Sequence, residues 1–344
     1  MRALQLIEWK HAAELRDVVE PEPGAGEVLV RIGAAGACHS DLHLMHDFEA
    51  GALPWTPPFT LGHENAGWIE SVGDGVRGIE VGTPIAIYGP WGCGRCHRCR
   101  LGSENYCEQQ AALGAYGGGL GLDGGMAPLM RVNARHVVPL DSLSPVAAAP
   151  LTDAGLTPYH AIKRSLHLLG AGSFAVVIGA GGLGHMAVQI LTACTRATII
   201  AVDQSAQALA FAREAGAAYC VLAGDEAKAE ILGHTRGRGA DVVIDIVGTN
   251  DTLALAAAVA RQLGHVTLVG LGGGTLPFGF FAPAYEVSVA STYWGSLPEL
   301  MEVIALAEQG AIRAQVQEFS LDDAVHAYEL LAAGAVHGRA VIVP

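Results

Sequence analysis

The pattern of apolar and polar positions changes part-way along the chain. Before residue 139, short apolar runs bounded by glycine and proline recur without helical segments between them, at residues 28–32, 66–72, 84–88 and 136–139. Strands without intervening helices predict a compact β-rich unit. After residue 147, apolar runs rich in β-branched residues alternate with segments of helical periodicity, which predicts a doubly wound α/β domain around a parallel sheet.

The elements expected in the second half follow from this alternation. The apolar runs predict strands buried on both faces, at residues 175–178, 197–202, 219–222, 242–246 and 266–269. Helices are expected between them, at residues 183–194, 205–215, 226–234 and 252–262. Near residue 288 the alternation stops. Two amphipathic helices and a last strand follow, and we expect this tail to return to the β-rich unit, at residues 297–309, 321–333 and 340–343.

An uncharged segment at residues 165–195 requires a separate interpretation. Apart from histidine it carries no charge, and it is longer than the roughly 20 residues that span a bilayer. Glycines interrupt it in the middle, at Gly170, Gly172, Gly179, Gly181, Gly182 and Gly184. We therefore expect a strand, a turn and a helix here, and no membrane span. The first ten residues lack the apolar region of a signal peptide, which favours a cytoplasmic protein over a secreted one.

Composition and charge narrow the classes of function. The chain of 344 residues is 51% hydrophobic and 16% charged, which excludes disorder for most of it. A formal charge of -14 disfavours nucleic acid and anionic membranes as partners, so any anionic ligand must be held by a local device such as a helix N-terminus. Its 45 glycines indicate many tight turns, and the glycine-rich segment 114–125 is read as a loop.

Four of the seven cysteines lie within fifteen residues of one another. They are separated by two, two and seven residues, as Cys93, Cys96, Cys99 and Cys107. Four thiolates can close a tetrahedron around zinc and leave no open position, which predicts a structural site. An iron–sulfur cluster also takes four thiolates, and the spacing alone leaves it as an alternative.

A second group of ligand-type residues is dispersed along the sequence. Cys38, His63 and Asp153 are each weak signals, because a lone buried cysteine or histidine is more often part of a core. Together they supply a thiolate, an imidazole and a carboxylate. This set is typical of a catalytic zinc with a fourth position left for water or substrate.

The third motif is a glycine-rich turn between a strand and a helix. The strand at 175–178 runs into Gly179-Ala180-Gly181-Gly182-Leu183-Gly184, and the next strand ends at Asp203, nineteen residues after Gly184. A turn of this kind places a pyrophosphate at the helix N-terminus, and the acidic residue accepts hydrogen bonds from the ribose. A carboxylate would repel a 2′-phosphate, so NAD is favoured over NADP. A purely structural turn is the alternative.

With these motifs in place, the chain resembles the medium-chain, zinc-dependent alcohol dehydrogenases over essentially its whole length. Three strings resemble the bacterial NAD-dependent secondary alcohol dehydrogenases that accept bulky or aryl ketones, at residues 88–93, 149–158 and 293–295. One string departs from the family. Where relatives commonly carry Gly-Asp-Arg-Val, this chain has Gly82-Thr83-Pro84-Ile85, which removes a local ion pair.

The resemblance implies a domain organisation and a set of cofactors. Residues 1–150 and 295–344 would form a GroES-like catalytic domain that holds both zinc sites, and residues 151–294 a Rossmann domain that binds NAD(H). Two Zn²⁺ per subunit are expected, one catalytic and one structural. The strand at 286–291 resembles one that pairs across a dimer interface, and bacterial relatives favour a tetramer over a dimer.

It also implies roles for individual residues. Cys38, His63 and Asp153 would bind the catalytic zinc, with Glu64 beside it as an exchanging ligand. Asp41 would orient the histidine ligand. The remaining assignments are a proton relay to solvent through Ser40 and His43, cofactor contacts at His39, Gly179, Gly181, Gly182, Leu183, Gly184 and Asp203, and an aromatic substrate pocket at Trp55, Leu120, Tyr293 and Trp294.

The expected activity is hydride transfer between NAD(H) and secondary alcohols or ketones. Two alternatives on the same scaffold are a primary-alcohol or aldehyde enzyme and a polyol dehydrogenase. A third, from another class, is a non-catalytic or zinc-free dinucleotide binder related to quinone reductases. The joint presence of Cys38, His63 and Asp153 argues against that last reading.

Overall fold

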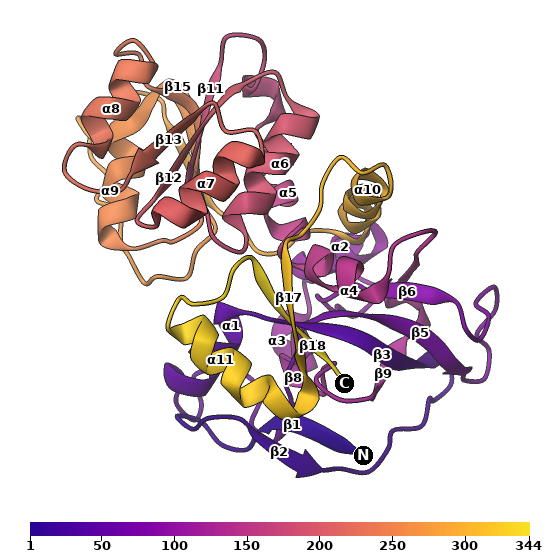
Figure 1. Cartoon of the computed structure of the whole chain (residues 1–344). Helices are drawn as coiled ribbons and strands as arrows, with labels where there is room; N and C mark the ends of the chain where they lie inside the picture. The colour runs from indigo at the N-terminus through magenta and orange to yellow at the C-terminus, as the bar shows by residue number, and fades with distance from the viewer. The chain divides into compact units, whose positions relative to one another are not determined.

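The computed structural model describes all 344 residues and divides them into two compact units (Figure 1). Unit 1 comprises residues 1–153, 295–308 and 314–344, and unit 2 comprises residues 154–294 and 309–313. The chain therefore leaves unit 1 and later returns to it. No helix is both long enough and apolar enough to cross a membrane.

Unit 1 is built on a seven-stranded, mostly antiparallel sheet. The order is β10-β6-β5-β3-β18-β17, and β9 also pairs with β3. The long strand β3 (Glu27–Ala37) is the centre of this sheet, since it pairs with three others. The remaining strands are β5 (Glu64–Val72), β6 (Pro84–Ile87), β9 (Leu129–Asn133), β10 (Val137–Pro139), β17 (Val316–Ser320) and β18 (Arg339–Val343).

Smaller elements complete unit 1. A second sheet has the order β2-β1-β4, and a pair of two-residue strands lies in the glycine-rich segment: β1 (Arg2–Leu6), β2 (Glu14–Asp17), β4 (Phe59–Thr60), β7 (Gly117–Gly118) and β8 (Gly121–Leu122). The helices are α1 (His39–His46), α2 (His97–Arg100), α3 (Gln110–Leu113), α4 (Pro145–Ala148), α10 (Leu297–Glu308) and α11 (Ala324–Ala332).

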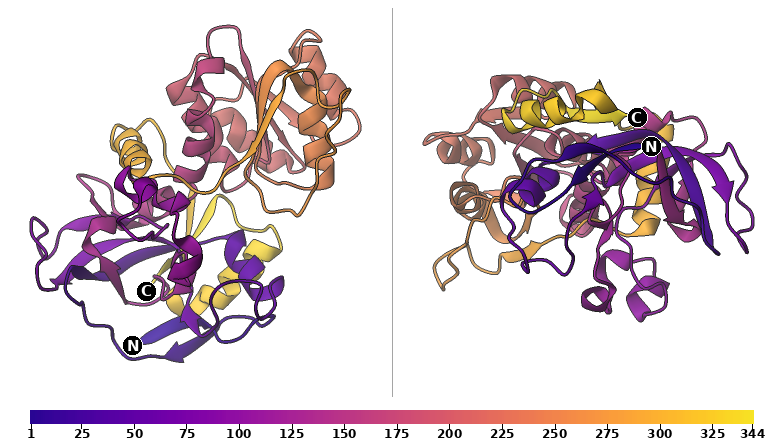
Figure 2. Two further views of the ribbon diagram at one scale, coloured as in Figure 1. Left: turned by 180° about the vertical axis from the view of Figure 1, so that it is seen from behind. Right: turned by 90° about the horizontal axis from the view of Figure 1, so that it is seen from below.

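The C-terminal tail is part of the unit 1 core. Strand β18 pairs antiparallel with β3, and α11 packs against α1, as the views in Figure 1 and Figure 2 show. The apolar faces of both helices enter one core cluster, with Leu44 and Met45 from α1 and Ala327, Tyr328 and Leu331 from α11. The last twenty residues are therefore placed beside the segment that follows β3.

Unit 2 contains the parallel sheet that the alternating pattern predicted. Its order is β13-β12-β11-β14-β15-β16, with every pair parallel, which confirms the doubly wound fold. The strands are β11 (Phe174–Ile178), β12 (Thr198–Asp203), β13 (Tyr219–Leu222), β14 (Ala240–Asp245), β15 (Ala260–Leu268) and β16 (Ser288–Ser291). The helices are α5 (Leu156–Lys163), α6 (Gly184–Cys194), α7 (Ala206–Glu214), α8 (Ala227–His234) and α9 (Asn250–Val259).

Two expected elements need correction. The helix predicted at 252–262 ends at Val259, and β15 begins at the next residue, because Ala260 pairs with Ala240 of β14. The alanine-rich run favours a helix, and because periodicity alone cannot separate the end of a helix from a short buried strand, it did not place this boundary. The segment 114–125, expected as a plain loop, holds β7 and β8.

Candidate active site

Four ligand-type side chains converge in unit 1 from three separate places in the sequence. Cys38 lies between β3 and α1, His63 and Glu64 lie at the start of β5, and Asp153 follows the short 3₁₀ turn at Ala149–Thr152. All four are buried, and their ligand atoms lie within 4.8 Å of one another. Asp153 Oδ2 is 3.9 Å from Cys38 Sγ and 3.7 Å from His63 Nε2.

The histidine of this cluster is oriented by Asp41. His63 Nδ1 lies 3.1 Å from Asp41 Oδ1, and a carboxylate is only an acceptor, so Nδ1 is the donor in this hydrogen bond and Nε2 is the ring atom left to face a metal. Nε2 is the atom that faces Asp153. Asp41 is itself fully buried and also accepts hydrogen bonds from the backbone N–H of Cys38 at 3.0 Å and from the hydroxyl of Tyr328 at 2.7 Å.

Glu64 is held by a buried ion pair with Arg339. One carboxylate oxygen, Oε1, pairs with the guanidinium, whereas Oε2 is buried and has no hydrogen-bond partner. Room for the side chain comes from Gly36 on the neighbouring strand, because a Cβ there would lie 2.2 Å from Glu64 Oε2. A buried acceptor without a donor, next to a thiolate, an imidazole and a second carboxylate, fits a bound cation.

The charge balance of the cluster favours the ligand form of Cys38. Burial alone would raise the pKa of the thiol, but the positive charge of Arg339 and a hydrogen bond with His63 lower this pKa below its ordinary value. The thiolate is the form that binds a metal. Cys38, His63 and Asp153 therefore supply the thiolate, imidazole and carboxylate of a zinc site, and Glu64 adds a second carboxylate beside them.

The expected proton relay lies on the first turns of α1. Ser40 Oγ is 3.6 Å from Cys38 Sγ, which places the hydroxyl at the rim of the cluster. His43 is one turn further along and its Nδ1 pairs with the carboxylate of Asp47, near the protein surface. His39, expected to contact the cofactor, is exposed. The hydroxyl and the imidazole thus lie on one helix between the cluster and solvent.

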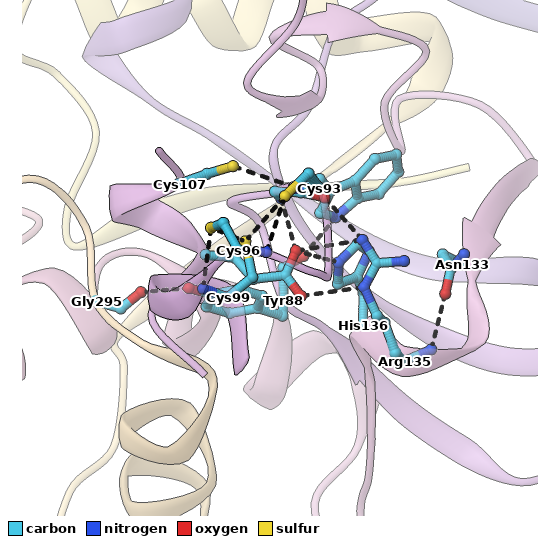
Figure 3. A network of polar contacts seen from close by, with 12 residues as sticks. Tyr88, Cys93, Cys96, Cys99, Cys107, Asn133, Arg135, His136 and Gly295 are labelled. Atoms are coloured by element: carbon cyan, nitrogen blue, oxygen red, sulfur yellow. Dashed lines mark hydrogen bonds and ion pairs between the residues drawn. The ribbon is translucent and has the colours of Figure 1, made fainter. Parts of the chain in front are cut away.

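The four closely spaced cysteines form the second cluster (Figure 3). Cys99 Sγ lies 3.4 Å from Cys96 Sγ and 3.9 Å from Cys93 Sγ. Backbone N–H groups point at the sulfurs: those of Cys96 and Cys93 lie 3.3 Å from the sulfurs of Cys93 and Cys107. Backbone hydrogen bonds lower the pKa of Cys93 to about 6, which favours a thiolate. Four sulfurs without an open position fit a structural metal.

Glu104 ties this cysteine loop (residues 92–107) to the rest of unit 1. It accepts a hydrogen bond from the Gly92 N–H at 2.6 Å, and Arg135 and His136 contact its two oxygens at 3.0 Å. The sequence did not predict a role for Glu104, Arg135 or His136. A glutamate between two of the cysteines was the only local signal, and its partners lie about thirty residues away.

In unit 2, the glycine-rich turn has the geometry of a dinucleotide-binding loop. Gly179 has a φ of +89°, and a Cβ on Gly184 would lie 1.8 Å from the carbonyl oxygen of Gly179, so both positions require glycine. A Cβ on Gly181 would meet nothing. Asp203, at the end of β12, accepts hydrogen bonds from the N–H groups of Ala180 at 2.7 Å and Ser205 at 2.8 Å.

The residues expected to line a substrate pocket lie in both units. In unit 1, Trp55 is buried, packs edge-on against Tyr116 with ring centroids 4.8 Å apart, and belongs to the same core cluster that Leu120 contacts. In unit 2, Trp294 is buried and Tyr293 is 37% exposed, with their rings 6.1 Å apart. The pocket assignment stays a prediction.

Sequence reasoning missed two residues beside the ligand cluster. Arg339 opens the apolar strand β18, and a lone charge in such a run was a usable signal of a buried ion pair. Tyr328 gave no signal. It lies at helical spacing with the buried Ala324, Ala327 and Leu331, which is the pattern of a core residue.

Comparisons with known families agree with this geometry. Residues 24–142 match the alcohol dehydrogenase GroES-like domain, and residues 182–309 match the zinc-binding dehydrogenase family. Among curated proteins, the chain is 38% identical to an NAD-dependent alcohol dehydrogenase of Sulfurisphaera tokodaii, with all of both chains covered. It is 37% identical to a D-arabinose 1-dehydrogenase (NADP(+)) of Saccharolobus solfataricus, covering 100% of this chain and 97% of the other.

Solved structures agree as well. The alcohol dehydrogenase of Aeropyrum pernix superposes with a TM-score of 0.93 at 37% identity over all of both chains. The acetophenone reductase of Geotrichum candidum, solved in complex with NAD, gives 0.87 at 31% identity over 100% of this chain and 97% of the other. Fold, ligand clusters and full-length similarity together place this chain in the family of medium-chain, zinc-dependent alcohol dehydrogenases.

Proposed function

We propose that this NAD-dependent zinc alcohol dehydrogenase interconverts secondary alcohols and ketones, including bulky or aryl ones. The buried cluster of Cys38, His63, Glu64 and Asp153 is the observation that carries the catalytic assignment. Bound there, zinc supplies a Lewis acid that polarises the substrate oxygen, while NAD(H) accepts or donates the hydride. Cys93, Cys96, Cys99 and Cys107 are proposed to hold the structural zinc.

The chain's own residues have separate tasks in this proposal. Cys38, His63 and Asp153 hold the catalytic metal, Glu64 serves as an exchanging ligand, and Asp41 fixes the ring of His63. Ser40 would take the proton of the alcohol and His43 would release it to solvent. Their spacing of one turn on α1 supports this order, with the serine at the ligand cluster and the histidine near the surface.

In unit 2, the cofactor assignment rests on the strand, turn and helix of the dinucleotide motif. The turn from Gly179 to Gly184, including Gly182 and Leu183, is proposed to receive the pyrophosphate at the N-terminus of α6. Asp203 would accept hydrogen bonds from the adenosine ribose. In unit 1, His39 is exposed on α1, which leaves it free for the proposed phosphate contact.

The catalytic assignment is tested by replacing one metal ligand. Cys38→Ser should reduce turnover to background and the zinc content from about two to about one per chain, because the structural site is untouched. Cys220→Ser is the matched control, since Cys220 lies outside both clusters and its sulfur lies 3.3 Å from the carbonyl oxygen of Leu209, within unit 2. An active Cys38→Ser enzyme would remove the basis of the assignment.

Substrate class is tested by a panel with NAD. The aryl preference is supported by the similarity to an acetophenone reductase and by the expected pocket residues Trp55, Leu120, Tyr293 and Trp294. The second candidate, a polyol dehydrogenase, is favoured by the similarity to a D-arabinose dehydrogenase. We expect 1-phenylethanol and 2-butanol to exceed benzyl alcohol, sorbitol and D-arabinose in kcat/KM, and the reverse order would favour the alternatives.

We also propose a tetramer in which the sheet edge of unit 2 forms one of the subunit interfaces, the one that pairs two chains. Strand β16 ends the strand order, so its outer edge is open within one chain. The segment that precedes β16 in the sequence carries four exposed aromatic side chains, Phe278, Phe280, Phe281 and Tyr285. An open edge beside exposed aromatic rings is typical of a surface that a second subunit covers. A cytoplasmic location stays a prediction that cell fractionation would test.

A further inference from the structure

Tyr328 is a buried tyrosine with a polar partner at the metal cluster. It lies on α11, which packs against α1 (Figure 1), and it is 5% exposed. Its hydroxyl lies 2.7 Å from Asp41 Oδ2 and 3.3 Å from Met126 Sδ. None of the roles proposed above involves this residue, although its hydroxyl is two hydrogen bonds away from the imidazole of a metal ligand.

Asp41 connects the tyrosine to that ligand. Its carboxylate is fully buried and has three donors: the Cys38 N–H at 3.0 Å and the Tyr328 hydroxyl at 2.7 Å on Oδ2, and His63 Nδ1 at 3.1 Å on Oδ1. The Cys38 donor comes from the same helix start as Asp41. Apart from His63 itself, Tyr328 is therefore the donor that holds the carboxylate from a different element.

The direction of this hydrogen bond is settled by the chemistry of its partners. Burial and the neighbouring charge of Asp41 raise the pKa of Tyr328 well above its ordinary value, so the phenol keeps its proton. An ionised carboxylate accepts only, which makes Tyr328 the donor. A buried carboxylate that loses one of its donors is left with an uncompensated lone pair and relaxes toward its remaining partners.

We infer that Tyr328 is a positioning residue of the catalytic metal site, which holds the Asp41 carboxylate and, through it, sets the orientation of the His63 ring. This rests on the proposed function, because it takes Cys38, His63 and Asp153 as the metal ligands. Groups that orient a ligand histidine commonly change metal affinity by 10- to 100-fold when they are removed. Tyr328 is one hydrogen bond further from the ligand histidine than Asp41, so the lower end of that range, about 10-fold, is expected.

The test compares two isosteric substitutions in the zinc-loaded enzyme. Tyr328→Phe removes the hydroxyl and keeps the ring in the core. Tyr88→Phe is the matched control, because Tyr88 is fully buried in unit 1 and its hydroxyl donates to the carbonyl of Gly295 at 2.7 Å. The readout is the rate at which a chelator removes the more labile zinc, with the absorption spectrum of the cobalt-substituted site as a second measurement of ligand geometry.

We expect Tyr328→Phe to release this metal about 10-fold faster and to shift the cobalt spectrum, whereas Tyr88→Phe matches the wild type in both. Release rates and spectra of Tyr328→Phe equal to those of Tyr88→Phe would overturn the inference and leave a packing role. Failure of the proposed function looks different, because the wild-type chain itself would then lack the second metal or any alcohol turnover.

A double-mutant cycle separates action through Asp41 from a general loss of stability. If Tyr328 acts through that carboxylate, Tyr328→Phe adds little to the metal release rate once Asp41→Asn is present. Independent effects would multiply, and that result counts against a positioning role. Because each comparison uses folded protein that retains its structural zinc, a variant that loses both metals is scored as a folding defect and contradicts the inference.

Discussion

At the scale of single residues, Glu104 shows how a buried charge supports a metal loop. It is 4% exposed, and hydrogen bonds from His136 and Arg135 lower its pKa to about 2 although burial alone would raise it. Against an ordinary value of 4.5, the ionised form gains about 3 kcal/mol. Because this pKa is depressed, the stabilisation is fully present above pH 4.5 and is lost as the pH falls toward 2.

Glu104→Gln should therefore reduce the free energy of unfolding by about 3 kcal/mol at pH 7. The difference from the wild type should shrink below pH 4.5, where the carboxyl of the unfolded wild-type chain takes up a proton while the folded one stays ionised. Urea titrations followed by tryptophan fluorescence measure the free energy of unfolding. Trp91 is a probe close to Glu104, because its ring stacks on that of His136 with the ring centroids 5.3 Å apart. Glu70→Gln is the control: its pair with Arg31 is exposed, so less than about 1 kcal/mol is expected. Equal losses in the two variants would contradict the role of Glu104.

Asp203 governs cofactor choice at the same scale. Asp203→Gly removes the carboxylate that would repel a 2′-phosphate, and the ratio of kcat/KM with NADP to that with NAD should rise by about 10-fold or more. Some thermal stability is lost as well, because Asp203 also binds the Ala180 and Ser205 N–H groups. Steady-state kinetics with both cofactors measure the ratio. Asp225→Gly, an exposed position in the same unit, should leave it unchanged.

At the scale of elements, the start of α6 separates a folding requirement from a ligand contact. A Cβ on Gly184 would lie 1.8 Å from the Gly179 carbonyl oxygen, whereas a Cβ on Gly181 meets nothing and has no unfavourable φ. Gly184→Ala should lower the melting temperature of the protein by several degrees and abolish NADH binding, since the turn and the helix can no longer close.

Gly181→Ala tests whether the backbone at this position contacts the cofactor. The melting temperature should stay within about 1 °C of the wild type, because the methyl group has space. NADH affinity should nevertheless fall, by about 10-fold, if the pyrophosphate approaches this backbone as closely as the motif predicts. Fluorescence titration of NADH measures both variants. Unchanged affinity in Gly181→Ala would move the phosphate contact elsewhere in the turn.

The elements that the sequence predicted well are those with one dominant physical signal. The strands of unit 2 were visible because burial on both faces requires continuous apolar runs, and β11 to β14 lie within two residues of their expected positions. Helix α1 and the sheet β2-β1-β4 were missed. Helix α1 carries three histidines and an aspartate among its eight residues, so its few apolar residues do not form a recognisable helical pattern in the sequence.

The whole molecule shows a similar division for the candidate site. Spacing predicted the four-cysteine cluster, whereas residue types together with the family resemblance predicted Cys38, His63, Glu64 and Asp153, and the structure brings both sets together. The roles of Arg339 and Tyr328 were not predicted, because their partners, Glu64 and Asp41, lie 275 and 287 residues away in the sequence. Contacts at such separations depend on how the tail returns to β3, which no local pattern encodes.

The open edge of strand β16 is the proposed contact between subunits. If β16 pairs with the same strand of a second subunit, a charge on its open edge should prevent that pairing. Val289 lies in β16 and is 38% exposed, so Val289→Lys should be tolerated within one chain and should convert the tetramer into smaller species. Light scattering after size exclusion measures the mass. Val19→Lys, at a position 92% exposed in unit 1, should keep the wild-type mass. If Val289→Lys keeps that mass too, subunit pairing does not occur at β16, and the exposed rings near Phe280 require another partner surface.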